Sequence, residues 1–171
     1  MENKHIENNQ QKAIEKLKEL TSSIDMCIFC TGVKSNAGAS SRPMSTAGVD
    51  DNGNIWFFSD KNSEKNQEIA SDSRVQLFYS HPGKSSYMVI DGTATISFDK
   101  QKIDSLWTPL AKTWFKEGKD DPNISLIKVS NVNAHYWDTK GNRMVNFLKI
   151  IVSAATGKTL IEAEEGNLNV H

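Results

Sequence analysis

Residues 41–68 constrain the fold more than any other segment, because a tight turn and a helix start follow each other within it. The segment reads SRPMSTAGVDDNGNIWFFSDKNSEKNQE. Its Asn52-Gly53 pair is among the strongest short-range signals for a β-hairpin, since both residue types tolerate a positive φ angle. β-prone runs flank this pair on both sides. We therefore predict that residues 42–49 pair with residues 54–59.

A helix is predicted directly after this hairpin. The polar run at 60–63 offers N-cap residues, and residues 64–70 have helical character. Lys65 would then lie in the first turn, where the helix dipole favours an anion and disfavours a lysine. If the hairpin brings Arg42 close, the two cations, the Ser63 hydroxyl and the free amides converge on a site suited to phosphate. For these residues taken alone, solvated surface charges are the commoner explanation.

The length and charge of the chain fit one globular domain. A chain of 171 residues can enclose a complete core without disulfides or metals, so we expect a single domain over residues 1–171. Residues 1–9 are expected to form a flexible tail and residues 158–171 a peripheral one. Lys and Arg number 20 against 21 Asp and Glu, and the basic residues are dispersed, which argues against nucleic acid as a partner. No apolar run is long enough for a signal peptide or a membrane span, which predicts a cytoplasmic protein without membrane contact.

The two cysteines, Cys27 and Cys30, have the C-x-x-C spacing of redox pairs. Redox pairs lie at a helix start, where the thiol pKa falls, whereas residues 24–30 have the pattern of a strand. Side chains three apart on a strand point to opposite faces, so we expect small buried hydrophobic residues rather than a dithiol site. Two cysteines are too few for a zinc site, and the histidines show no ligand spacing, so no metal site is expected.

Hydrophobic periodicity divides the rest of the chain into short strands and helices. The predicted strands are residues 24–33, 74–79, 87–98 and 124–137, and the predicted helices are residues 7–20, 99–110 and 142–155, the last closed by Gly157. A phase slip between Leu126 and Ile127 predicts a β-bulge. Strands joined by hairpins, with helices inserted between them, favour a β-barrel or another α+β arrangement over a doubly wound sheet. The sequence also lacks the dinucleotide motif G-x-G-x-x-G, which argues against a Rossmann fold.

Six short motifs occur in the order found in one known family. They are Ser41-Arg42-Pro43-Met44, Trp56-Phe57-Phe58-Ser59, Asn62-Ser63-Glu64-Lys65-Asn66, Tyr87-Met88-Val89-Ile90-Asp91-Gly92-Thr93-Ala94, WFKEGKDDP at 114–122 and Tyr136-Trp137-Asp138. With these motifs, over roughly residues 10–155, the chain resembles the FMN-binding split-barrel superfamily that includes pyridoxamine phosphate oxidase. Within that superfamily it is most similar to the bacterial general stress protein branch. The resemblance implies an α+β, mainly β fold, namely a split β-barrel with peripheral helices.

The resemblance also implies a cofactor and the residues that bind it. In such families FMN lies between two protomers, so we expect a homodimer with the flavin at its interface. A small-molecule ligand is also expected. FAD or another flavin is the alternative cofactor. The implied cofactor-binding residues are Arg42, Pro43, Met44, Phe58, Ser59, Ser63, Lys65 and Trp137. Arg42, Ser63 and Lys65 would hold the phosphate, with Arg42 contributing more than Lys65 because a guanidinium binds bidentately. Trp137 would approach the flavin from the partner chain, or would serve packing instead.

Two departures from the vitamin oxidases bear on function. Glu64 stands where those enzymes usually carry an arginine, and the tail holds Glu162, Glu164 and Glu165 in place of a basic segment, which argues against vitamin B6 oxidation. The resemblance therefore implies a stress-related, FMN-dependent oxidoreductase whose substrate is unknown. The alternatives are a flavin-sequestering stress protein without turnover and a degenerate barrel that binds another anionic ligand. No catalytic side chain is assigned, because no Ser-His-Asp or Cys-His arrangement can be placed.

Overall fold

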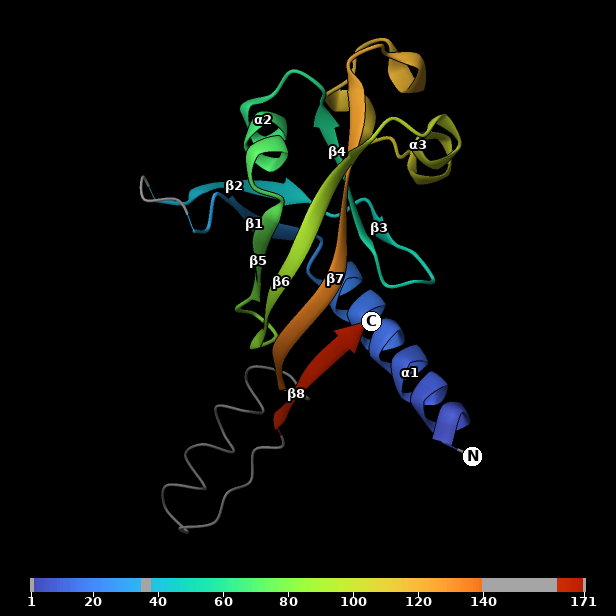
Figure 1. The fold of residues 1–171 in the computed structure, drawn as a ribbon, viewed down its shortest axis with the longest axis vertical. Coiled ribbons are helices and arrows are strands. Elements are labelled where there is room, and N and C mark those ends of the chain that lie inside the picture. The colour runs from blue at the N-terminus through green and yellow to red at the C-terminus, as the bar shows by residue number, and fades with distance from the viewer. Residues whose placement is uncertain (1, 35–37, 140–162, 171) are drawn as a thin grey trace.

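One curled antiparallel sheet forms the centre of the molecule (Figure 1), in a computed structural model that describes residues 2–34, 38–139 and 163–170. Its eight strands follow the order β2-β1-β5-β6-β7-β4-β3, and β8 pairs with β7 outside this path. The strands are β1 (Met26–Thr31), β2 (Ser40–Ser45), β3 (Gly48–Val49), β4 (Ile55–Asp60), β5 (Arg74–His81), β6 (Ser86–Ser97), β7 (Ile124–Thr139) and β8 (Ala163–Val170). This mainly β architecture with helices at its periphery confirms the predicted class.

The helices surround the sheet, and α2 and α3 start where the capping signals of the sequence place them. They are α1 (Glu2–Ser23), α2 (Glu64–Ser71), α3 (Lys100–Leu106) and the 3₁₀ turns η1 (Ala111–Thr113) and η2 (Gly118–Asp120). At the start of α3 the Asp99 carboxylate accepts a hydrogen bond from the Lys102 amide at 3.2 Å, as an N-cap residue does. Ser63 is the N-cap residue of α2, although its hydroxyl makes no capping hydrogen bond.

The first helix closes the core. Ile14, Leu17 and Leu20 of α1 are buried among strand residues, as their helical spacing predicts. The helix is longer than the predicted 7–20, because it takes in residues 2–9, which the sequence pattern set apart as a tail.

The pairing predicted between residues 42–49 and 54–59 is only partly correct. The Asn-Gly turn forms and joins β3 to β4, with Gly53 at a φ angle of 75°. β2 instead pairs with β1, where Arg42 lies opposite Phe29. A turn signal specifies only the residues next to the turn, so it does not determine the partner of the more distant β2.

Two clusters of buried side chains lie on opposite faces of β4 and β7. Ile127 belongs to the larger cluster, and Leu126 belongs to a smaller one that includes Ile103 and Phe115. Leu126 and Ile127 are both fully buried because each face of the strand is covered, so the bulge predicted between them is wrong. The register between β6 and β7 shifts instead near Asn131, whose φ angle is 52°.

The last described strand adds the C-terminal residues to the sheet. β8 pairs with the C-terminal half of β7, and its Leu168 is buried in the main core. Residues 163–170 are therefore a strand of the sheet, where the sequence analysis expected a peripheral tail over 158–171. The predicted helix at 142–155 and its closing Gly157 lie outside the described residues.

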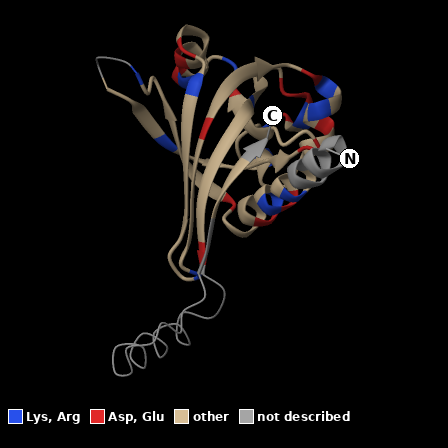
Figure 2. Ribbon diagram, turned by 60° about the horizontal axis from the view of Figure 1, so that its bottom comes forward, with Lys and Arg blue, Asp and Glu red and all other residues tan. Residues whose placement is uncertain are grey.

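The cysteines and the charges agree with the sequence analysis. Cys27 and Cys30 are free and buried on β1, and burial raises the pKa of the Cys27 thiol to about 12, which keeps it protonated. Figure 2 shows acidic and basic residues interspersed on helices and loops, while the long strands are mostly uncharged. None of the helices in the described part of the chain is long and apolar enough to cross a membrane.

Candidate functional site

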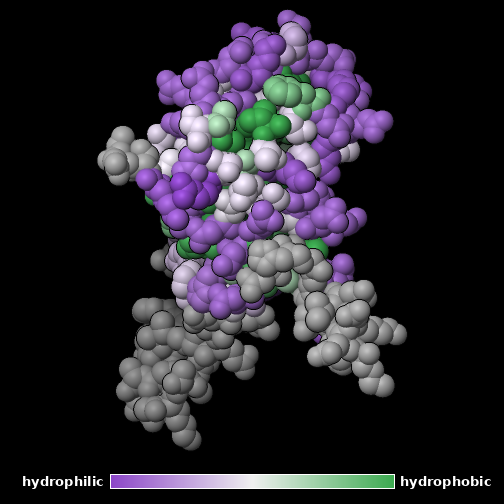
Figure 3. Space-filling view, in the orientation of Figure 1, coloured by the Kyte–Doolittle hydropathy of each residue, from purple (hydrophilic) through white to green (hydrophobic). Residues whose placement is uncertain are grey.

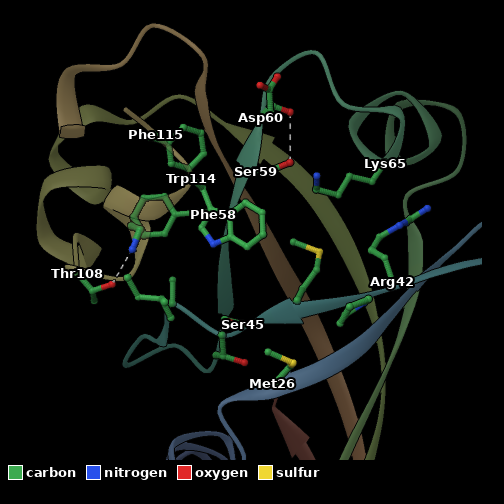
Figure 4. Close-up of a pocket in the computed structure, with 16 residues that line it drawn as sticks. Met26, Arg42, Ser45, Phe58, Ser59, Asp60, Lys65, Thr108, Trp114 and Phe115 are labelled. Carbon is green, nitrogen blue, oxygen red and sulfur yellow. Dashed lines mark hydrogen bonds between the residues drawn. The ribbon is translucent and has the colours of Figure 1, made fainter. Parts of the chain in front are cut away.

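A cavity of about 490 Å³ opens between β2, β4, the start of α2 and the segment that carries η1. This volume lies within the range of small-molecule sites in proteins. Figure 4 shows that aromatic side chains gather on one side of the cavity and that Arg42 and Lys65 lie on the other. We call the first side, made by Phe58, Trp114 and Phe115 with Leu110, the aromatic end, and the second, made by Arg42 and Lys65, the cationic end.

Lys65 supplies the free charge of the cationic end. Its side chain extends from the first turn of α2 into the cavity (Figure 4). Within the described ranges it makes no hydrogen bond or ion pair. Partial burial, followed by the neighbouring charge of Arg42, lowers the pKa of Lys65, while Asp60 and Glu68 act in the opposite direction. A half-buried ammonium beside another cation is costly, so this end of the cavity favours an anion.

Arg42 approaches the cavity from β2, but its guanidinium already has partners. Nη2 donates to Glu68 Oε2 at 2.7 Å, and Nη1 donates to the hydroxyl of the buried Thr31 at 2.7 Å. Figure 4 shows the guanidinium directed away from the centre of the cavity, whereas the Lys65 ammonium is directed toward it. Arg42 therefore joins β2 to α2 by an ion pair at the edge of the cavity.

A buried hydrogen-bond network fixes the start of α2 next to the cavity. The Asn66 side-chain oxygen accepts from the Ser59 hydroxyl at 2.7 Å, and its amide nitrogen donates to the Ser125 hydroxyl at 2.9 Å. Ser125 in turn donates to the Ser59 carbonyl at 3.0 Å. The network joins α2 to β4 and β7, so the position of Lys65 is determined by groups that solvent does not reach.

The aromatic end is less enclosed. Phe58 packs edge-on against Trp107, with ring centroids 5.7 Å apart, and lies 6.2 Å from the Phe115 ring. In contrast, Trp114 is 80% exposed and Leu110 is 57% exposed. Figure 3 shows that the surface facing the viewer is mostly hydrophilic, with a small apolar patch in the half that contains α2 and α3. Exposed aromatic residues beside a cavity are typical of a surface that a ligand or a partner covers.

The structure brings together six of the eight residues implied by the resemblance. Those that line the cavity are Arg42, Pro43, Met44, Phe58, Ser59 and Lys65. Ser63 lies beside the cavity without lining it, and its hydroxyl lies 3.2 Å from that of Ser59. Trp137 lies on β7 away from the cavity, 41% exposed, with its ring edge-on to His135. Its predicted approach to a partner's site remains a prediction.

Glu64 lies apart from the cavity, although it is next to Lys65 in sequence. It is exposed and lines a neighbouring hollow, which Glu68 also lines. The repulsion between this carboxylate and a bound anion is therefore weaker than the sequence order suggests.

Sequence reasoning missed the partners of Arg42 and the wall of the aromatic end. Glu68 and Thr31 lie far from Arg42 in the sequence, and no local pattern signals their contact. Trp114 and Phe115 were assigned to a motif but not to the site. Two aromatic residues ahead of a polar loop were the available signal.

In the described part of the chain, no three His, Cys, Asp or Glu side chains lie close enough together to hold a metal ion.

Comparison with known proteins shows that most of the chain matches one family. The family described as pyridoxamine 5′-phosphate oxidase like matches residues 12–161. The protein bli-3 of Neurospora crassa is 25% identical over 127 residues, which make up 69% of this chain and 61% of that protein. The chain thus spans less than two thirds of the length of this relative.

Solved structures share the fold. A protein assigned as general stress protein 26 from Jannaschia sp. CCS1 superposes with a TM-score of 0.73 at 24% identity, covering 91% of this chain and 94% of its own. The general stress FMN/FAD binding protein of Xanthomonas citri superposes with a TM-score of 0.57 at 25% identity, covering 75% and 88%. These similarities confirm the predicted split-barrel fold.

Proposed function

The chain belongs to the pyridoxamine 5′-phosphate oxidase like family, and from this premise we propose that it binds a flavin, with FMN as the cofactor, in the cavity between β2, β4 and α2. The observation that carries the proposal is the cationic end. Lys65 is a half-buried cation that makes no hydrogen bond or ion pair with the described residues and lies beside a second cation, Arg42. A phosphate would supply the missing negative charge.

The other side chains of the cavity fit the rest of the cofactor. Met44 and Phe58 provide apolar surface along its length, and the Ser59 hydroxyl lies near the cationic end. Trp114 and Phe115 are placed to contact a planar ring. The description of the Xanthomonas citri protein as an FMN/FAD binding protein supports a flavin, with FAD as the alternative.

We propose that the bound flavin performs redox chemistry on a small molecule. The flavin itself supplies hydride or electron transfer, so the protein needs only to bind, orient and shield it. The description of the Jannaschia and Xanthomonas citri proteins as general stress proteins supports a role under stress.

Sequestration of flavin without turnover is the second candidate. It is favoured by the charged side chains that line the cavity, since among the described residues these are Arg42, Lys65 and Asp60 alone. A second charged substrate would therefore have no cation of its own to bind.

Two measurements test these functions. Titration of the purified protein with FMN, followed by visible absorption, should shift the flavin bands in a saturable way. A flavin spectrum identical to that of free FMN at every concentration would reject flavin binding. Anaerobic reduction of the bound flavin, followed by mixing with a panel of acceptors, separates the two candidates. Reoxidation faster than that of free flavin supports an oxidoreductase, and reoxidation at the rate of free flavin supports sequestration.

We also propose a homodimer in which the partner completes the aromatic end. Apolar residues are exposed on one face of the sheet, where Ile28 lies opposite Phe78 and Tyr87 lies opposite Trp137. A partner that covers this face would bury Trp137. Light scattering at micromolar concentration in the presence of FMN should give the mass of two chains, and the mass of one chain would reject the proposal.

A further inference from the structure

The ion pair between Arg42 and Glu68 lies at the edge of the cavity, because Arg42 lines the cavity and Glu68 lines the neighbouring hollow. Both side chains are partly buried, with 24% and 29% of their surfaces exposed, and their charged atoms are 2.7 Å apart. The Thr31 hydroxyl accepts from Arg42 at 2.7 Å and donates to the same Glu68 oxygen at 2.6 Å. Arg42, Glu68 and Thr31 thus form a closed set of three contacts.

Glu68 is a charged competitor in this set. The hydrogen bond from Thr31 lowers the pKa of Glu68, and Ser40 and Arg42 act in the same direction, so the side chain is a carboxylate at neutral pH. Arg42 and Lys65 together carry two positive charges, and Glu68 offsets part of this charge, as does Asp60, which lines the cavity and also acts on Lys65. Replacing Glu68 with a neutral residue therefore raises the net charge at this end of the cavity by one.

We propose that Glu68 sets the charge selectivity of the anion site, by reducing its preference for a phosphate monoester over a phosphate diester. The proposal rests on the function proposed above. A monoester such as that of FMN carries nearly two negative charges at pH 7, whereas each phosphate of the FAD pyrophosphate carries one. A site with less positive charge discriminates less between them than a site with more, because the Coulomb attraction scales with the product of the charges.

The geometry assigns this role to Glu68 rather than to Glu64. Both glutamates lie on α2, but only Glu68 contacts Arg42. Both glutamates also line the neighbouring hollow, but Glu64 is exposed whereas Glu68 is partly buried. Solvent screens the charge of an exposed side chain. Glu64→Gln thus makes the same change in net charge at a position without contact to the cationic end, and it is the matched control.

The test compares the affinities of three flavins for the parent protein, Glu68→Gln and Glu64→Gln at fixed ionic strength. Glu68→Gln should tighten FMN by about five- to tenfold, the difference between a charged and a neutral hydrogen-bond partner for Arg42. FAD should tighten by a smaller factor, and riboflavin, which lacks a phosphate, should not change. Glu64→Gln should change all three affinities by less than about twofold.

A second variant separates charge from positioning. Glu68→Ala removes the hydrogen bonds of Glu68 together with its charge, and the proposal expects it to tighten FMN as Glu68→Gln does. If Glu68 instead positions Arg42 for the phosphate, Glu68→Ala weakens FMN, and the proposal is overturned. Because the Arg42–Glu68 pair is partly exposed, both variants should fold with an unfolding midpoint near that of the parent.

The results distinguish failure of this inference from failure of the proposed function. FMN binding that Glu68→Gln leaves unchanged or weakens overturns the selectivity role alone, as does equal tightening of FMN and riboflavin. No binding of any flavin by the parent protein or the variants overturns flavin binding and the selectivity role with it.

Discussion

Lys65 and Arg42 lie at an end of the cavity whose walls are held by buried hydrogen bonds, whereas Trp114 and Leu110 lie at an end that solvent reaches. At the cationic end, Asn66 connects α2 to two strands through groups that are nearly inaccessible to solvent. At the aromatic end, the 80% exposed Trp114 follows a single 3₁₀ turn. The difference supports the proposal that the groups that bind the anion lie within one chain, while a ligand or a partner covers the ring side.

Of the substitutions that test the difference between the two ends, Asn66→Ala should have the largest effect, and it acts on stability. The substitution leaves the buried Ser59 and Ser125 without their partner, which should lower the free energy of unfolding by about 2–4 kcal/mol. Urea denaturation measures the change. Asn62→Ala, at an exposed position near the same helix start, is the control and should change stability by less than about 0.5 kcal/mol. Equal effects of the two substitutions would show that the network does not hold α2.

A smaller effect is expected from Trp114→Ala at the aromatic end. Because Trp114 is exposed, its removal should leave the free energy of unfolding within about 0.5 kcal/mol of the parent value. It should weaken FMN and riboflavin by the same factor, about fivefold, since both share the ring that it contacts. Fluorescence titration with the two flavins measures this, and Lys112→Ala on the same 3₁₀ turn is the control. A loss confined to FMN would place Trp114 at the phosphate instead.

The smallest effect should follow from Glu64→Arg. The sequence alone suggests that this change restores a family charge next to the phosphate, but Glu64 is exposed and lines the neighbouring hollow rather than the cavity. Because solvent screens a charge at this exposed position, the gain in FMN affinity should be less than about threefold. Isothermal titration at low and at physiological salt measures it. A tenfold gain at physiological salt would mean that residue 64 faces the anion directly.

Local signals in the sequence predicted α2, which carries Lys65, and two central strands of the sheet. The polar run before Glu64 predicted the start of α2, and strict alternation predicted β5 and β6, because periodicity and capping depend on neighbouring residues. The resemblance then identified six residues that line one cavity. Their proximity could not be derived from spacing alone.

Contacts between distant segments could not be predicted from the same signals. The partner of β2, the burial of both Leu126 and Ile127, and the pairing of Arg42 with Glu68 each depend on which elements pack together. The pairing of Arg42 with Glu68 changes the expected contributions of Arg42 and Lys65 to phosphate binding. A guanidinium alone should hold phosphate better than an ammonium, but Arg42 shares its charge with Glu68, so we expect Lys65 to contribute more.

The central claim is that the cationic end binds the phosphate of a flavin, and the ratio of FMN to riboflavin affinity tests it most directly. The parent protein should bind FMN about ten- to a hundredfold more tightly than riboflavin, the range expected for hydrogen bonds to a charged group. Lys65→Met keeps the apolar stem of the side chain and removes its charge, so it should lower this ratio by about tenfold while riboflavin affinity stays constant. If Lys65→Met weakens FMN and riboflavin by the same factor, Lys65 acts on the ring site or on folding, and the phosphate anchor is contradicted.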